Sequence, residues 1–289
     1  MDIIFDYPAH TWWVTVFGLL LGLVVGSFLN VVIGRFPVMM QRQWQRECAE
    51  VTGVTPSEQH EPFNLAKPNS HCPKCKSPIK WYDNIPVISW LVLRAKCRSC
   101  GTGISVRYPL IELLTGIVFA LIVWNLGFTF TTFVYLFLAC LLISMFFIDA
   151  DHMLLPDQMT YLMLWTGLGF AIYSAHIPLQ DAVIGAIAGY LALWSVYWAF
   201  KLITGKEGMG YGDFKLLAAF GAWHGYQLLP VTIIAAAASG AVIGIVWQQI
   251  NRNKQGQPIP FGPFLICGGV IAMLWGEQLL RGYLNWVHG

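Results

Sequence analysis

Residues 130–157 read FTTFVYLFLACLLISMFFIDADHMLLPD, an apolar run followed by three aspartates. The apolar part, Phe130–Ile148, comes close to crossing a hydrocarbon core of about 30 Å at about 1.5 Å per helical residue. Asp149 follows it directly, and a carboxylate at the edge of a bilayer is costly to keep charged. The stretch therefore predicts a membrane helix that ends on a functional acid.

Seven further apolar segments share this length and character. Hydrophobic residues make up 56% of the 289-residue chain and charged residues 11%, about half the charged share of a typical soluble domain. We therefore predict an all-α polytopic membrane protein with about eight transmembrane helices. Lys215 and His224 make the sixth segment the weakest. The seven are Trp12–Ile33, Leu110–Leu126, Met159–Ala175, Ala182–Phe200, Phe214–Leu229, Val231–Ile250 and Phe261–Leu280.

The basic residues predict the orientation of these helices. Eleven of the 17 Lys and Arg residues lie between Arg35 and Arg107, and none lies from Tyr108 through Phe200. Eight crossings place 16 of the 17 on one side, which the positive-inside rule makes cytoplasmic. Seven crossings would place Arg252 and Lys254 outside. We expect a multi-pass membrane protein with its functional face toward the cytoplasm. The net charge of +2 gives no reason to expect nucleic acid.

One sizeable polar stretch interrupts the apolar segments, and it contains two C-x2-C knuckles. They are Cys72-Pro-Lys-Cys75 and Cys97-Arg-Ser-Cys100. Paired knuckles can aim four thiolates at one tetrahedral ion. The chain therefore divides into a first membrane helix (residues 1–33), a small cytoplasmic zinc-binding domain (34–107) and a seven-helix membrane domain (108–289).

Two other interpretations of the cysteines stay open. Disulfides would need an oxidising compartment, whereas the predicted topology places the knuckles in the reducing cytoplasm. Iron is a second possibility, although two knuckles on a small polar domain favour zinc. We expect a structural metal, because a short segment with few apolar residues can fold around an ion.

A second acidic string, Gly210-Tyr211-Gly212-Asp213, opens the sixth apolar segment. Glycines permit positive φ angles and close approach of another chain, so a peptide can lie against the backbone beside Asp213. In the first string, we expect Asp157 to cap the next helix and Asp151 to be solvated. We expect Asp149 to face the interior of the helix bundle. A polar turn between helices is the plain alternative for that string. Two acids at one membrane face instead suggest an aspartic protease pair.

Small and polar residues within the apolar segments predict helix contacts. Gly18, Gly22 and Gly26 form one small-residue stripe, and similar stripes recur at Gly185–Gly189 and Gly240–Gly244. Such stripes let helices pack closely. Asn30 and Glu112 are candidates for hydrogen bonds between helices, although Glu112 could also lie near the surface.

Taken in order along nearly the whole chain, these motifs resemble the type IV prepilin peptidases of bacterial pilus and type II secretion systems. Besides the knuckles and the two acidic strings, the resemblance includes Gly26–Ile33 with Arg35–Pro37, Asn84–Leu91 and Arg107–Glu112. Two positions depart from the family pattern: Ala95 stands where a glycine is usual, and Gly34 where a histidine is frequent.

The resemblance implies an enzyme whose catalytic aspartates match Asp149 and Asp213. Members of that family cut a short basic leader from prepilins and pseudopilins at the cytoplasmic face of the membrane. Many then methylate the new N-terminal amine with S-adenosylmethionine, an activity associated with the knuckle-bearing insertion. Ala95 makes methyl transfer the less firmly implied activity.

Two functions of other classes compete with this interpretation. A proton-coupled transporter would use the two acids as relay groups, but it favours acids near the bilayer midplane on broken helices. A non-catalytic scaffold with a zinc domain would leave Asp149 and Asp213 without a role.

Overall fold

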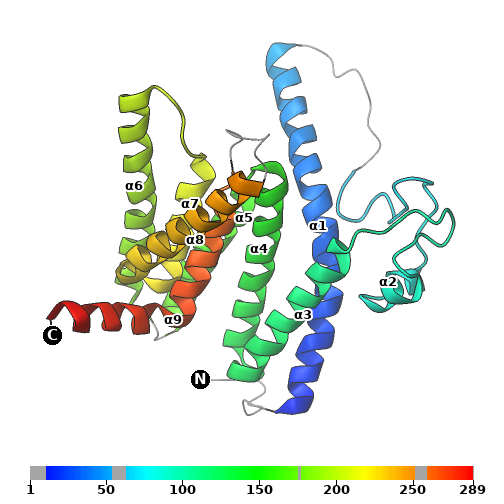
Figure 1. The fold of residues 1–289 in the computed structure, drawn as a ribbon, viewed down its shortest axis with the longest axis horizontal. Helices are drawn as coiled ribbons and strands as arrows, with labels where there is room; N and C mark the ends of the chain where they lie inside the picture. Colours follow the sequence, from blue (N-terminus) through cyan, green and yellow to red (C-terminus); the bar gives the residue numbers. More distant parts are fainter. Residues whose placement is uncertain (1–10, 54–62, 175–176, 251–258, 289) are drawn as a thin grey trace. The chain divides into compact units, whose positions relative to one another are not determined.

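The computed structural model describes residues 11–53, 63–174, 177–250 and 259–288. Within these residues the chain is helical, and its only strand-like pairs are isolated bridges. The all-α class is thereby confirmed. The eight apolar segments form eight helices (Figure 1), namely α1 (Trp12–Thr52), α3 (Arg107–Leu126), α4 (Phe130–His152), α5 (Asp157–Tyr173), α6 (Leu179–Thr204), α7 (Tyr211–His224), α8 (Leu229–Ile250) and α9 (Gly262–His288).

Six helices in the described part of the chain are long and apolar enough to cross a membrane, and α5 and α7 are shorter. The 17 residues of α5 and the 14 of α7 extend about 26 and 21 Å at 1.5 Å per residue. Helix α7 stops at His224 because Gly225 follows with a φ of +77°. The chain is a multi-pass membrane protein, and eight is an approximate span count.

Helix α1 does not end where its apolar segment ends. It continues past Ile33 and through Pro37 to Thr52, and it closes on Gly53 with a φ of +67°. The polar stretch that we expected to begin at residue 34 thus begins as helix. The boundary between a membrane helix and a separate domain at this point stays a prediction.

The chain divides into two compact units at Ser144 and Met145. In the first, α1 packs along α3 through its stripe of glycines. A Cβ at Gly22 would lie 2.7 Å from the Gly116 Cα, so only glycine permits this approach. The Asn30 Nδ2 donates a hydrogen bond to the Tyr108 carbonyl oxygen at 3.1 Å. The stripe and the Asn30 contact between helices are both confirmed.

In the second unit, α7 is the central helix, and it contacts α5, α6 and α9. Its side chains are buried on all sides, as a helix that is apolar all round requires; Phe214, Leu217 and Phe220 are among them. The stripe on α6 allows this arrangement, because a Cβ at Gly185 would meet the backbone of Gly221. The backbone of α7 is therefore held tightly along its length.

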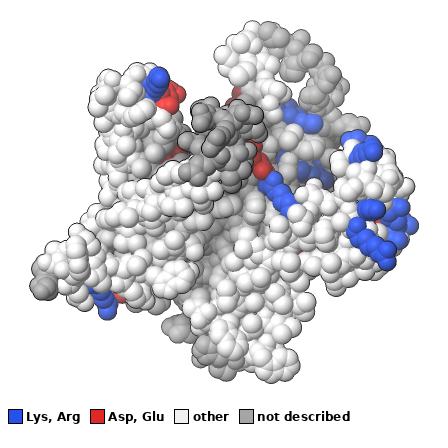
Figure 2. Space-filling model, in the orientation of Figure 1, with Lys and Arg blue, Asp and Glu red and all other residues white. Residues whose placement is uncertain are grey.

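Charged side chains are unevenly distributed over the surface. Most blue side chains in Figure 2 lie over the knuckle-bearing segment, whereas the helices present a largely uncharged surface. Large apolar side chains are exposed along the helices, including Leu20, Val24 and Phe28 on α1 and Ile187 and Leu191 on α6. Exposed apolar side chains of this size along the helices fit a lipid environment.

Candidate active site and metal centre

The second unit brings together the two acids that the sequence singled out. Asp149 lies in the last turn of α4 and Asp213 in the first turn of α7. Both are buried, with exposed fractions of 5% and 7%. The two carboxyl groups are close enough for their charges to interact, and the Leu155 side chain lies against both Gly212, beside Asp213, and Gly262, beside Asp149. Two strings far apart in the sequence therefore contribute to one acidic site.

Gly262, the first residue of α9, lies against Asp149. A Cβ at Gly262 would be 2.5 Å from the Asp149 Oδ2, so a larger residue would displace the carboxyl group. The same Oδ2 is buried and has no hydrogen-bond partner among the described residues. Sequence reasoning missed Gly262, although a glycine followed by Pro263 at the start of the last apolar segment was an available signal.

The two glycines of the second string do not act as we expected. Neither has a positive φ; Gly210 has a φ of −81°. Gly212 is required by packing instead, because a Cβ there would lie 2.7 Å from the Leu155 Cβ. Gly210 is exposed, and a Cβ there would meet only the Asp213 Oδ2, at 3.8 Å. The loop is open on the Gly210 side of Asp213.

The predicted N-cap at Asp157 is wrong. Pro156 occupies the N-cap position of α5, and Asp157 is the first helical residue. Its Oδ1 accepts a hydrogen bond from the Lys215 Nζ at 2.6 Å. Asp157 therefore links α5 to α7, whereas Asp151 is exposed at the end of α4.

The two cysteine knuckles have the same backbone hydrogen bonds. In the first, the Cys72 N–H donates to the Ser77 carbonyl at 2.9 Å and the Lys76 N–H donates to the Cys72 carbonyl at 2.9 Å. The second repeats this pattern from Cys97 to Thr102 and from Gly101 to Cys97, at 2.8 and 2.9 Å. The residue after the second cysteine of each knuckle is left-handed, with a φ of 60° or 68°. Local sequence thus sets both turns.

Together the knuckles form a four-cysteine cluster. The sulfurs of Cys72, Cys75, Cys97 and Cys100 all lie within 4.8 Å of one another, and those of Cys72 and Cys100 are 3.8 Å apart. A tetrahedral ion with sulfurs at about 2.3 Å separates its ligands by about 3.8 Å. None of the seven cysteines of the chain forms a disulfide. The arrangement fits a metal site and not two disulfide bonds.

The segment before the third cysteine holds two residues in an unusual backbone conformation. Arg94 and Ala95 have φ angles of 51° and 58°. Glycine adopts this left-handed region without steric cost, whereas residues with a Cβ are disfavoured there. The Ala95 backbone is used on both sides, because its N–H donates to the Trp90 carbonyl and its carbonyl accepts from the Ile104 N–H. Ala95 thus takes a backbone shape that suits glycine.

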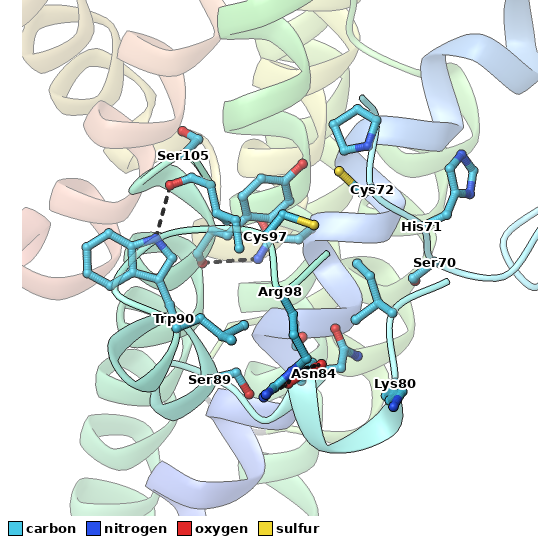
Figure 3. Close-up of a pocket in the computed structure, with 18 of the residues that line it drawn as sticks. Ser70, His71, Cys72, Lys80, Asn84, Ser89, Trp90, Cys97, Arg98 and Ser105 are labelled. Atoms are coloured by element: carbon cyan, nitrogen blue, oxygen red, sulfur yellow. Dashed lines mark hydrogen bonds and ion pairs between the residues drawn. The ribbon is translucent and has the colours of Figure 1, made fainter. Parts of the chain in front are cut away.

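A pocket of about 600 Å³ lies within the first unit. Its walls come from α1, the first turns of α3, both knuckles, the 3-10 helix η1 (Trp81–Asn84) and the short helix α2 (Ile88–Val92). Figure 3 shows Trp90 on one side of it and Cys72 with His71 on the other. The Trp90 Nε1 donates a hydrogen bond to the Ile104 carbonyl at 3.1 Å, which fixes that wall.

Comparisons with known proteins match two successive parts of the chain to two family models. Residues 20–126 match the bacterial peptidase A24 N-terminal domain, and residues 136–245 match the type IV leader peptidase family. No solved structure gives a significant match.

Three curated relatives named "prepilin leader peptidase/N-methyltransferase" align with this chain over 267 residues, which is 92% of each chain. They come from Stutzerimonas stutzeri, Pseudomonas aeruginosa and Neisseria gonorrhoeae, at identities of 50%, 49% and 49%. Matches of this extent leave no ambiguity about descent. The chain belongs to the type IV leader peptidase family.

Proposed function

We propose that this chain is a membrane enzyme with two activities. It cleaves the leader peptide from prepilins and pseudopilins, and it then methylates the new N-terminal amine. The observation that carries the first activity is the meeting of Asp149 and Asp213 in one buried site, with the Asp149 Oδ2 unpartnered among the described residues. The names of the relatives support both activities.

The proposed cleavage uses the two acids as a pair that shares one proton. Two adjacent carboxyl groups do not both ionise readily, so one is charged while the other holds the proton. The charged member accepts a proton from the attacking water, and the protonated member donates to the scissile carbonyl oxygen. The unpartnered Asp149 Oδ2 offers a buried acceptor for such a water. The exposed backbone at Gly210 leaves room for a peptide beside Asp213.

We place the site at the cytoplasmic face of the bacterial inner membrane. Basic residues gather in the segment between α1 and α3, and positive charge is retained on the cytoplasmic side. A site at this face meets the short basic leader of a prepilin before that leader could cross the bilayer.

The four-cysteine cluster is proposed to hold a structural zinc ion. Four thiolates in a closed tetrahedral shell leave no position open for a substrate. Lys74, Lys76, Lys96 and Arg98 flank the cysteines and offset part of their negative charge. The ion would join two turns that are separated by 21 residues, and so stabilise the segment that contains them.

S-adenosylmethionine is the proposed methyl donor. The donor supplies a methyl group on a positively charged sulfur, which a free amine can attack. The pocket of about 600 Å³ in the first unit has a volume within the range of small-molecule sites. The described residues therefore include a space that fits such a ligand.

The test replaces Asp149 or Asp213 by asparagine, which keeps the shape of the side chain but cannot exchange the proton. Each variant should cleave a purified prepilin at least about 10³-fold more slowly, while Asp181→Asn on α6 serves as the control and cleaves normally. Asp213→Asn should still methylate pilin that has already been cleaved. A variant that is inserted normally and retains more than a few per cent of cleavage would refute the pair.

A further inference from the structure

Two acids line the pocket in the first unit, and they are held differently. Asp83 is paired with Arg98, whose Nη2 lies 2.6 Å from its Oδ1 and whose Nε lies 2.9 Å from its Oδ2. Glu112 is buried, with 8% of it exposed, and its Oε2 accepts a hydrogen bond from the Val87 N–H at 2.8 Å. A carboxylate offers about four acceptor positions, so Glu112 retains acceptor capacity for a ligand in the pocket.

The backbone that holds Glu112 is strained. Val87 has φ and ψ of 60° and −49°, and a β-branched residue with positive φ is a true outlier. Strain of this kind gathers at binding and catalytic sites, where surrounding contacts enforce it. Here it directs the Val87 N–H at the Glu112 carboxylate. The first turns of α3 and the residue before α2 together fix the position of one acid in the pocket wall.

We propose that this pocket is the methyl-transfer site, in which Glu112 receives the N-terminal amine of the cleaved chain beside bound S-adenosylmethionine. The inference rests on the proposed methyl transfer and adds its location and the group that holds the amine. A pilin that has lost its leader presents one new cationic group, its N-terminus. Glu112 supplies the complementary charge, and its own side chain is buried.

The reaction balances with these groups alone. The terminal ammonium first gives a proton to the Glu112 carboxylate. The free nitrogen then attacks the methyl carbon, and the N–C bond forms as the C–S bond breaks. The bonding electrons stay on sulfur, so the positively charged donor becomes the neutral thioether S-adenosylhomocysteine. The positive charge passes to the nitrogen, which becomes a secondary ammonium.

The location is tested by filling the pocket. Gly34 on α1 lines it, and a Cβ there would meet no atom within 4 Å. Gly34→Trp should weaken the binding of S-adenosylhomocysteine, measured by calorimetry, by about tenfold or more. Gly169→Trp on α5 is the control, since Gly169 is equally open but lies outside the pocket. Unchanged binding to Gly34→Trp would overturn the location.

Folding is checked by zinc content and by prepilin cleavage, both of which should stay at the wild-type level. If Gly34→Trp fails either check, Gly103→Trp introduces the same ring into the pocket from the second knuckle, where a Cβ also meets nothing. The location fails if that variant, too, binds S-adenosylhomocysteine normally.

The role of Glu112 is tested by its contact with the amine. With S-adenosylhomocysteine present, wild-type protein should bind a cleaved-pilin peptide about tenfold more tightly than its N-acetylated form, as a charge-assisted hydrogen bond predicts. Glu112→Gln should lose that preference and methylate at least about 10²-fold more slowly, with S-adenosylhomocysteine binding unchanged. Glu277→Gln on α9 is the matched control.

The outcomes separate this inference from the proposed function. A wild-type protein that methylates no pilin peptide contradicts the proposed second activity itself. A wild-type protein that methylates, with Glu112→Gln retaining the amine preference, contradicts only the assignment of Glu112. Loss of S-adenosylhomocysteine binding in Glu112→Gln would also overturn it, since the acid would then hold the donor and not the amine.

Discussion

The cysteine cluster and the acid pair are assembled by different forces. Each cysteine knuckle is a short turn closed by its own backbone hydrogen bonds, and the proposed zinc ion would join the two turns. The acids sit on helices α4 and α7, whose positions depend on packing against α5, α6 and α9. The first centre should therefore respond to loss of an ion, and the second to small steric changes in helix contacts.

The largest expected effect is loss of the metal. Wild-type protein should contain about one zinc per chain, and Cys72→Ser or Cys97→Ser should contain none, because three thiolates bind zinc far more weakly than four. Segment 63–106 should become sensitive to protease. Cys48→Ser, which changes an exposed cysteine outside the cluster, should keep its zinc. Iron in wild-type protein by elemental analysis, or zinc retained in both knuckle variants, would contradict this.

Next in size is a steric change at the acid pair. Gly262→Ala places a methyl group 2.5 Å from the Asp149 Oδ2, so the carboxyl group must turn away. A misplacement of this kind should slow prepilin cleavage by about 10- to 100-fold without changing zinc content. Gly282→Ala on the same helix meets nothing within 4 Å and should cleave at the normal rate. Equal rates for the two variants would show that Gly262 does not position Asp149.

A smaller effect is expected at Asp157, one of the two acids of the first string that lie outside the pair. Asp157→Asn weakens an ion pair with Lys215 whose side chains are 51% and 20% exposed. Pairs with this much exposure contribute about 1 kcal/mol or less. Cleavage assays should therefore find a rate within a few-fold of wild type. A loss as deep as that of Asp149→Asn would mean that Asp157 takes part in the chemistry.

The smallest effect concerns the left-handed residue before the third cysteine. Ala95→Gly removes an unfavourable Cβ but adds chain entropy, so stability should change by no more than about 1 kcal/mol. Ala95→Val places a β-branched side chain at the φ of 58° and should destabilise the segment more. The temperature of zinc release compares the two. Methyl transfer that rises sharply in Ala95→Gly would show that alanine limits that activity.

The cysteine cluster depends on local turns and the acid pair on helix packing, and this difference decides how well each could be predicted from sequence. Each knuckle is a local turn, since the backbone N–H groups of Cys72 and Cys97 donate to carbonyl groups only five residues further along the chain. The cluster was therefore foreseeable from sequence. The apolar segments likewise predicted the helices, and the glycines at 18, 22 and 26 predicted a close contact.

What the sequence could not supply was the set of partners contributed by other helices. Asp157 looked like a cap because its neighbours in sequence are Pro156 and an apolar run, but its partner Lys215 lies on α7. Gly262 is far from Asp149 in sequence, so nothing local linked them. Glu112 left two interpretations open, and the decision came from the backbone of Val87, which no periodicity describes.

The equivalence of the two knuckles has a consequence for how the segment can be altered. Beyond the cysteine turns, the Ile79 N–H donates to the Ser70 carbonyl, and the Ile104 N–H donates to the Ala95 carbonyl at the matching position. The two turns therefore have the same pattern of backbone hydrogen bonds. A segment built from two copies of either turn should therefore still present four cysteines with the same backbone hydrogen bonds.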